Sequence, residues 1–301
     1  MHTYVEDSPR SDVKVASVAA FSGSFAPNAR PADTFKLPWY QRREYFLGGW
    51  LDPEIWKAAF IETVGTTCLV VTSGHIAATL MSYGTTQIGA YIGISSIFLL
   101  SVFIYATAGL TGGHLNPMVT FSSIITGLCP LSRGTLYICA QTAGSALAGG
   151  IIIGIYGRER AVQIHGGGCF YDPSHMSSGQ VFLSETFASF VLLYLAYGVG
   201  LDPRQALLFG PKFGPLLVGL SVGLVAFATS GMAPGYAGAQ MHPARCFAFG
   251  IARRNLSGQW IWWFGPALAA VLFAAIYNMV PPTPRKEAQD SSTPTLNINP
   301  A

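Results

Sequence analysis

Two short segments of the chain share an unusual pattern of glycine, a polar side chain and proline. Residues 112–121 read GGHLNPMVTF and residues 238–247 read GAQMHPARCF. Asn116 stands before the first of these prolines and His242 before the second. An amide and an imidazole in these places can donate hydrogen bonds, so the chemistry they indicate is the binding of a polar solute. The sequence contains no recognisable nucleophile–base pair or metal-ligand cluster, and we expect no enzyme activity, metal or cofactor.

The two prolines place these side chains at the start of short helices. Proline favours the first helical position, so Pro117 and Pro243 predict two helix N-termini, each carrying roughly half a positive charge. The preceding glycines allow an extended backbone whose carbonyl oxygens face a cavity instead of lipid. The residues expected to line it with carbonyls are Gly112, Gly113, His114, Leu115, Gln240 and Met241. Carbonyl acceptors that lead to two donors in a positive field suit neutral solutes and oppose cations and protons.

The composition indicates a membrane protein. Of the 301 residues, 50% are hydrophobic and only 10% are charged, whereas soluble domains carry about 25% charged residues. We predict an all-α membrane protein, because the apolar stretches reach the roughly 20 residues that cross a bilayer and none alternates as a barrel strand does. The predicted spans are Ile55–Leu80, Gln87–Leu110, Leu131–Tyr156, Gly179–Gly200, Lys212–Gly231 and Gly258–Val280. Residues 111–127 and 239–254 are apolar but too short to cross, which is typical of re-entrant half-helices.

The order of these elements forms an internal repeat. Residues 55–156 and 179–280 each contain two spans, a short segment and a third span, with Glu62 and Glu185 at matching places in the first span. Because each unit has an odd number of spans, the second is inverted, and the two half-helices meet at mid-membrane. Charges at this depth are costly. We therefore expect the two glutamates to accept hydrogen bonds from the re-entrant backbone, with a proton relay as the alternative.

Charge predicts the orientation of the chain. Lys and Arg concentrate on the side that holds both tails, which indicates cytoplasmic termini. Residues 1–54 and 281–301 form polar tails with the composition of disordered segments, and residues 55–280 form the membrane domain. We expect a multi-pass protein of the plasma membrane, with lipid, water and small neutral solutes as partners and no nucleic acid.

From about Ile55 to Val280 the sequence resembles the aquaporin, or major intrinsic protein, family. HLNPMVTF is similar to the first family motif with Met118 in place of alanine, and HPARCF is similar to the second with His242 in place of asparagine. Cys246 directly after Arg245, and GGGC at 166–169, resemble the X intrinsic protein branch. The resemblance implies a right-handed bundle of six transmembrane helices and two half-helices, a pore in each protomer and a homotetramer. The implied pore motifs comprise Asn116, Pro117, Met118, His242, Pro243 and Ala244.

The resemblance also implies a selectivity filter at the outer side of the pore. Its positions correspond to Ser96, Ser230, Ala239 and Arg245, with Ser95 or Thr229 as alternatives for the helix positions. This ring is wide and polar, and Arg245 supplies fixed donors and a permanent charge. We therefore predict a passive channel for small uncharged solutes such as glycerol, urea and hydrogen peroxide, with water as a further candidate.

His242 is the main departure from the family pattern. Two helix N-termini and Arg245 nearby favour a neutral imidazole that donates one hydrogen bond into the pore. Sensing of acid pH by the same ring is the alternative. The flexible Met118 is expected to fill space behind the first motif.

Two cysteines are expected on the outer side, Cys169 in a loop and Cys246 near the pore mouth. Both would face an oxidising compartment, and a disulfide between them would fix the loop over the entrance. A free, buried thiol beside Arg245 is the alternative, because pairing cannot be deduced from sequence.

Two other functions fit an inverted repeat. A secondary transporter also uses broken helices, although the spans offer few coupling residues. The second alternative is a non-conducting protein that keeps the fold and whose pore is closed by His242 and Met118.

Overall fold

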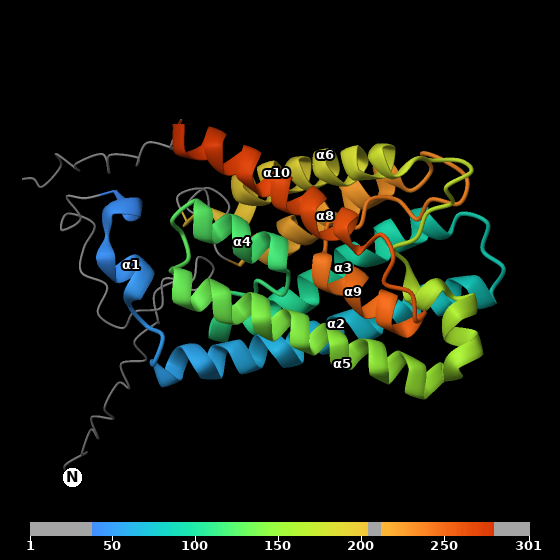
Figure 1. The fold of residues 1–301 in the computed structure, drawn as a ribbon, viewed down its shortest axis with the longest axis horizontal. Helices are drawn as coiled ribbons and strands as arrows, with labels where there is room; N and C mark the ends of the chain where they lie inside the picture. Colours follow the sequence, from blue (N-terminus) through green and yellow to red (C-terminus); the bar gives the residue numbers. More distant parts are fainter. Residues whose placement is uncertain (1–37, 204–211, 280–301) are drawn as a thin grey trace, which may run out of the picture.

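The computed structural model describes residues 38–203 and 212–279, and every regular element within them is helical. A short 3₁₀ turn and α1 come first, followed by helices that run roughly parallel to one long axis and two short ones between them (Figure 1). The elements are η3 (Trp39–Gln41), α1 (Arg43–Leu47), α2 (Pro53–Ser82), α3 (Ile88–Thr111), α4 (Pro117–Ile125), α5 (Leu131–Gln163), η4 (His165–Gly167), α6 (Ser178–Ala196), the π-helical turn η5 (Tyr197–Leu201), α8 (Gly214–Thr229), α9 (Pro243–Ala252) and α10 (Gln259–Met279).

The predicted all-helical fold is confirmed. Five of the described helices, α2, α3, α5, α6 with its π-helical turn, and α10, are long and apolar enough to cross a membrane. The fifth predicted span corresponds to α8, which is apolar but only 16 residues long. The two short predicted segments are the half-helices α4 and α9.

Two boundaries differ from the prediction. The third span continues to Gln163 instead of ending near Tyr156, with a break where Gly157 takes φ 73°. Part of the predicted N-terminal tail is folded, since η3 and α1 precede α2 and α2 itself begins at Pro53. The rest of that tail, and the C-terminal tail, lie outside the described residues.

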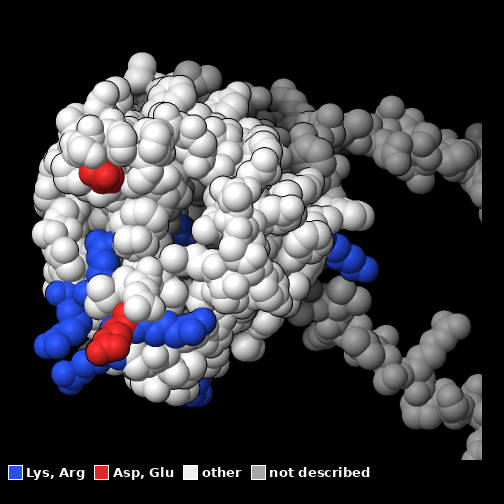
Figure 2. Space-filling model, turned by 90° about the vertical axis from the view of Figure 1, so that its right-hand side faces the viewer, with Lys and Arg blue, Asp and Glu red and all other residues white. Residues whose placement is uncertain are grey.

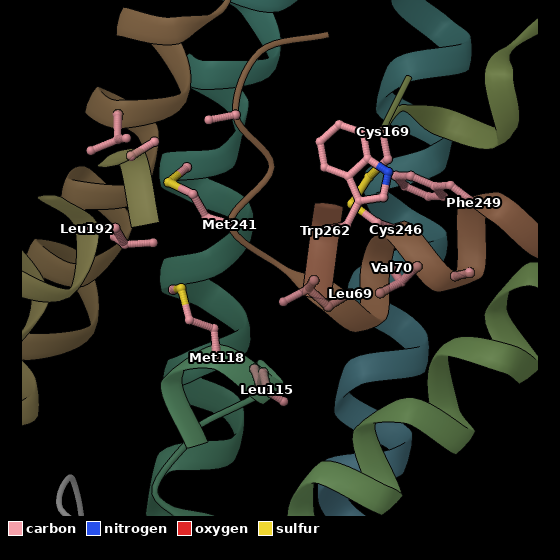
Figure 3. Close-up of a cluster of buried hydrophobic side chains, with 14 of the residues drawn as sticks. Leu69, Val70, Leu115, Met118, Cys169, Leu192, Met241, Cys246, Phe249 and Trp262 are labelled. Atoms are coloured by element: carbon pink, nitrogen blue, oxygen red, sulfur yellow. A yellow bond between two sulfur atoms is a disulfide. The ribbon is translucent and has the colours of Figure 1, made fainter. Parts of the chain in front are cut away.

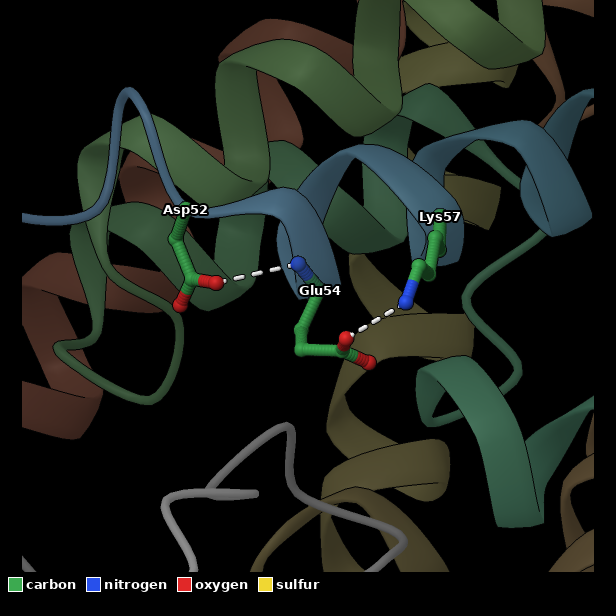
Figure 4. Close-up of polar contacts among 3 residues, drawn as sticks. All are labelled: Asp52, Glu54 and Lys57. Carbon is green, nitrogen blue, oxygen red and sulfur yellow. Dashed lines mark hydrogen bonds and ion pairs between the residues drawn. The ribbon is translucent and has the colours of Figure 1, made fainter.

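The first long helix starts on a clear capping signal. The Asp52 side chain accepts a hydrogen bond from the Glu54 backbone N–H at 2.9 Å, and Pro53 occupies the first helical position (Figure 4). Lys57 pairs with Glu54 one turn later at 2.7 Å. The side chains of Glu54 and Lys57 are both exposed. The Asp52 cap therefore stabilises the start of the helix more than this ion pair does.

Helix packing follows the inverted repeat. Within each unit the first and third spans pack together, α2 with α5 and α6 with α10, while α3 and α8 pack across the units. Each half-helix also packs on the third span of the opposite unit, α4 on α10 and α9 on α5. A Cβ on Gly144 would lie 2.4 Å from the Thr63 carbonyl oxygen, and one on Gly219 would lie 2.1 Å from Ser101 Oγ. Small residues therefore allow the close helix contacts that replace hydrophobic driving force in lipid.

The C-terminal end of α4 is contacted by α1 and by the last turn of α10. The Tyr45 hydroxyl of α1 contacts the carbonyl oxygens of Ile124 and Cys129, the latter at 2.6 Å. Asn278 at the end of α10 donates to the Ile125 carbonyl at 3.0 Å. The Asn278 contact satisfies a carbonyl that a helix end leaves without an intrahelical partner, and the Tyr45 contacts tie α1 to the turn that follows α4.

Candidate functional site: a passage past two helix N-termini

The two half-helices meet at their N-termini in the interior of the bundle. Asn116 caps α4 by accepting a hydrogen bond from the Met118 N–H at 2.9 Å. Its amide nitrogen donates at 2.9 Å to the carbonyl of Met241, the residue before His242. Pro117 and Pro243 occupy the first helical positions, as the sequence predicts. The junction therefore joins α4 directly to the loop that leads into α9.

His242 caps α9 in a different way. Its Nδ1 accepts a hydrogen bond from the Arg245 backbone N–H at 3.1 Å. A neutral ring whose Nδ1 accepts carries its proton on Nε2. Nε2 is buried and has no protein partner within the described residues, and His242 lines the inner cavity described below. The ring therefore carries its one N–H at a buried position beside that cavity.

The two buried glutamates hold the loops before the half-helices. Glu62 accepts from the backbone N–H groups of His114 at 3.2 Å and Leu115 at 2.7 Å. Glu185 accepts from the N–H groups of Gln240 at 2.7 Å and Met241 at 3.0 Å. This matched geometry favours loop support over a proton relay, because each glutamate binds two successive backbone N–H groups at the same place in its loop.

The supported loops contain strained backbone at equivalent positions. Leu115 has φ 50° and Met241 has φ 53°, the left-handed region that non-glycine residues rarely adopt. Such a conformation costs roughly 1–2 kcal/mol per residue, and here the glutamate contacts offset it. The strain lies directly before Asn116 and His242, where each loop turns into its half-helix.

Two cavities lie along the axis of the bundle. The one beside the Cys169–Cys246 disulfide, called the outer cavity, has a volume of about 220 Å³. The one beside His114 and Asn116, called the inner cavity, has a volume of about 60 Å³. Arg245 lines both, and the other residues that line both are Ser96, Val222, Gln240 and Met241. The two cavities therefore adjoin at this set of residues. Figure 2 shows a hollow near the middle of the outer face with basic side chains inside it and beside it.

The predicted filter residues lie together in the outer cavity. Ser96, Ser230, Ala239 and Arg245 all line it. Neither alternative, Ser95 or Thr229, lines this cavity or the inner one. The Thr229 hydroxyl accepts a hydrogen bond from the Ala239 N–H at 3.0 Å. Val222 was missed by the sequence analysis, although it lies two helical turns before Ser230 and so on the same face of α8.

The expected carbonyl-lining residues divide into two groups. Gly113, His114, Gln240 and Met241 line the passage. Gly112 and Leu115 line neither cavity; Gly112 ends α3 with φ 91°, and Leu115 is fully buried in the hydrophobic core. That their carbonyl oxygens line the passage stays a prediction.

The His114 ring, besides lining the inner cavity, lies 3.2 Å from the Thr120 hydroxyl. Met118 is buried in the core with Met241 and Leu192 (Figure 3). Within the described residues no group of three or more His, Cys, Asp or Glu could hold a metal.

The Arg245 guanidinium is hydrogen-bonded by Gln240. Its Nη2 donates to both the backbone carbonyl oxygen and the side-chain Oε1 of Gln240, at 3.1 and 2.8 Å. The Gln240 amide nitrogen donates in turn to the carbonyls of Gly238 at 2.8 Å and Ala237 at 3.2 Å. The sequence analysis assigned only the Gln240 carbonyl to the pore and missed its side chain.

A disulfide joins the outer loop to the second half-helix in the structure. Cys169 and Cys246 are bonded with their Cα atoms 5.3 Å apart, beside Trp262 and Phe249 (Figure 3). Arg253 also donates to the Cys169 carbonyl at 2.6 Å. The outer loop is therefore held against α9 at the mouth of the outer cavity.

Comparison with known proteins gives the same picture. The family model described as Major intrinsic protein matches residues 50–277. Aquaporin TIP4-3 of Zea mays is 34% identical over 234 residues, covering 75% of this chain and 88% of the relative. Probable aquaporin TIP4-1 of Oryza sativa subsp. japonica is 32% identical over 231 residues, covering 74% of this chain and 86% of the relative.

A solved structure supports the fold. The X-ray structure of the aquaglyceroporin from Plasmodium falciparum has a TM-score of 0.62 at 20% identity, covering 75% of this chain and 96% of that one. With the paired proline motifs, the head-to-head half-helices and the spanning helices described above, the chain belongs to the major intrinsic protein family and is an integral, multi-pass membrane protein.

Proposed function

We propose that the protein is a passive channel for small uncharged solutes such as glycerol, urea and hydrogen peroxide, with water as a further permeant. The observation that carries the proposal is the meeting of two helix N-termini beside an axial passage, with donors from Asn116, His242 and Arg245 at or near the junction. Helix N-termini and a fixed guanidinium repel cations, while carbonyls and N–H groups replace the hydration of neutral solutes.

The filter supports solutes larger than water. Ser96, Ser230 and Ala239 are small residues that line the same cavity as Arg245, so the outer cavity is wide and partly polar. Family relatives bear the name aquaporin, and the structural neighbour is titled an aquaglyceroporin. These names agree with a channel for water and small neutral solutes.

Finer assignments belong to the same proposal. We place the chain in the X intrinsic protein branch on Cys246 after Arg245 and on the GGGC segment. We also propose a homotetramer in the plasma membrane, with residues 55–280 as the channel domain and both tails cytoplasmic. Chemical cross-linking of the detergent-purified protein tests the tetramer, and a predominant dimer or monomer would contradict it.

Stopped-flow light scattering on proteoliposomes tests the function. Vesicles containing the protein should take up glycerol and urea faster than empty vesicles, with rates that rise linearly with solute concentration, as expected of a passive pore. Flux equal to that of empty vesicles would refute the channel. Saturation at low solute together with dependence on an ion gradient would favour a transporter instead.

A further inference from the structure

The contact between Gln240 and Arg245 has a consequence for which solutes the pore can hold. A guanidinium has five N–H donors in a fixed plane. It binds a planar oxyanion most strongly through two parallel hydrogen bonds from one edge. Both edges that can do this include Nη2, since one pairs Nη2 with Nε and the other pairs it with Nη1.

Gln240 occupies both hydrogens of that nitrogen. The backbone carbonyl takes one at 3.1 Å and Oε1 takes the other at 2.8 Å. Nε is buried without a partner within the described residues, so Nη1 is the nitrogen that keeps donors for a solute in the passage. Those donors can act singly, but no complete bidentate edge is left.

We propose that Gln240 is a specificity-determining residue that keeps Arg245 from gripping planar oxyanions, such as formate and nitrate, in the filter. This inference rests on the proposed channel function. A positively charged constriction attracts anions as it repels cations. A guanidinium with a free bidentate edge would retain them and obstruct neutral solutes, whereas single donors exchange a neutral solute readily.

The side chain is fixed in the orientation this role needs. Its amide nitrogen donates to the carbonyls of Gly238 and Ala237, which leaves Oε1 facing Arg245. A flipped amide would set N–H against N–H and oxygen against oxygen, so the hydrogen-bond network assigns the orientation. Cys169 Sγ lies 3.4 Å from Oε1, and a Cβ on Gly168 would lie 3.5 Å from it. The disulfide-linked outer loop thus packs over the amide and retains it.

The experiment compares urea flux in potassium nitrate, potassium formate and potassium chloride of equal osmolarity. Chloride is the control because a spherical ion gains little from a bidentate edge. The variant is Gln240→Leu, which keeps the bulk and removes the acceptor. Wild-type urea flux should be the same in all three salts.

Gln240→Leu should conduct urea in chloride and lose flux in nitrate and formate. We expect its affinity for these anions to rise about tenfold, the change that one added charge-assisted hydrogen bond produces. Adding Arg245→Lys to Gln240→Leu should remove the anion effect, because an ammonium has no planar fork. Equal flux of Gln240→Leu in all three salts, or inhibition of the wild type by nitrate, would overturn the inference.

A binding measurement keeps the inference separate from the channel function. In detergent, nitrate should raise the thermal unfolding midpoint of Gln240→Leu above its value in chloride and leave the wild type unchanged. Absence of that difference would count against the role of Gln240 even if a variant fails to conduct. A wild type without solute flux would instead refute the proposed function.

Discussion

At the residue scale, the substitution of histidine for asparagine breaks the symmetry of the junction. Asn116 both caps its own helix and bonds the opposite loop through the Met241 carbonyl. His242 caps its helix through Nδ1, but Nε2 has no protein partner within the described residues. The second motif therefore lacks the short hydrogen bond to the opposite loop that the Asn116 amide makes.

This asymmetry predicts different outcomes for two substitutions. His242→Ala removes the α9 cap and should lower the free energy of unfolding by about 1 kcal/mol. His242→Asn keeps a capping oxygen and should unfold close to the wild type. Thermal melts of purified protein measure both, and equal destabilisation by the two changes would contradict a capping role.

The same pair of proteins separates the two interpretations of His242. A ring that stays neutral predicts that the dependence of urea flux on pH between 5 and 8 is the same for wild type and His242→Asn. A pH sensor predicts a profile that the asparagine variant loses. Asparagine is also smaller than histidine, so the variant should conduct at least as fast as the wild type at pH 7.

At the scale of elements, α1 acts as a cap for the half-helix α4. Tyr45 contacts the carbonyl oxygens of Ile124 and Cys129, and a Cβ on Gly127 would lie 2.4 Å from the Trp39 ring. Tyr45→Phe removes the hydroxyl alone and should lower stability by about 1 kcal/mol, because the Cys129 carbonyl loses its side-chain donor while the Ile124 carbonyl keeps the Gly127 N–H. Tyr40→Phe is the matched control, since Tyr40 is largely exposed. Equal thermal midpoints for the two variants would refute the capping role.

The outer loop element predicts a dependence on pH. Burial and, to a smaller degree, the Arg253 charge lower the pKa of His165 below its ordinary value. The folded state then binds this proton less readily than the unfolded state, so stability falls as the pH drops through the ordinary histidine range near 6.5. The ring stacks on Phe170 with centroids 3.9 Å apart and lines the outer cavity.

The test of this pH dependence compares thermal midpoints of wild type and His165→Gln at pH 7.5 and 5.5. The wild type should lose more stability on acidification than the variant, because glutamine has no proton to gain. A variant that loses as much as the wild type would show that other groups cause the acid sensitivity.

The elements also show what sequence can and cannot predict here. The spans and half-helices were predictable because length, apolar composition and proline act locally. The extension of α5 beyond Gly157 was missed, since a glycine followed by charged residues is typical of a helix end. The Gln240 side chain was missed because its partners come together only when the loop folds. Tyr45 was missed because its segment has a polar composition and its partners lie far along the chain.

At the scale of the whole molecule, the two faces of the bundle have different chemistry. The described chain begins and ends at the same end of the bundle, with α1 and the last turn of α10 on one side (Figure 1). The disulfide between Cys169 and Cys246 and the outer cavity lie at the opposite end. Because disulfides persist in oxidising compartments, this opposite face should be the extracellular one.

This arrangement predicts where inserted epitope tags can be reached. Tags at either terminus should bind antibody only after cells are permeabilised, while a tag after Pro173 in the outer loop should bind in intact cells. The outer-loop tag is the control for surface delivery, since a protein retained inside the cell would show none of the three. One terminal tag reachable in intact cells would mean an odd number of crossings. The two repeats would then no longer be inverted, and a pore built from half-helices that meet at their N-termini would lose its basis.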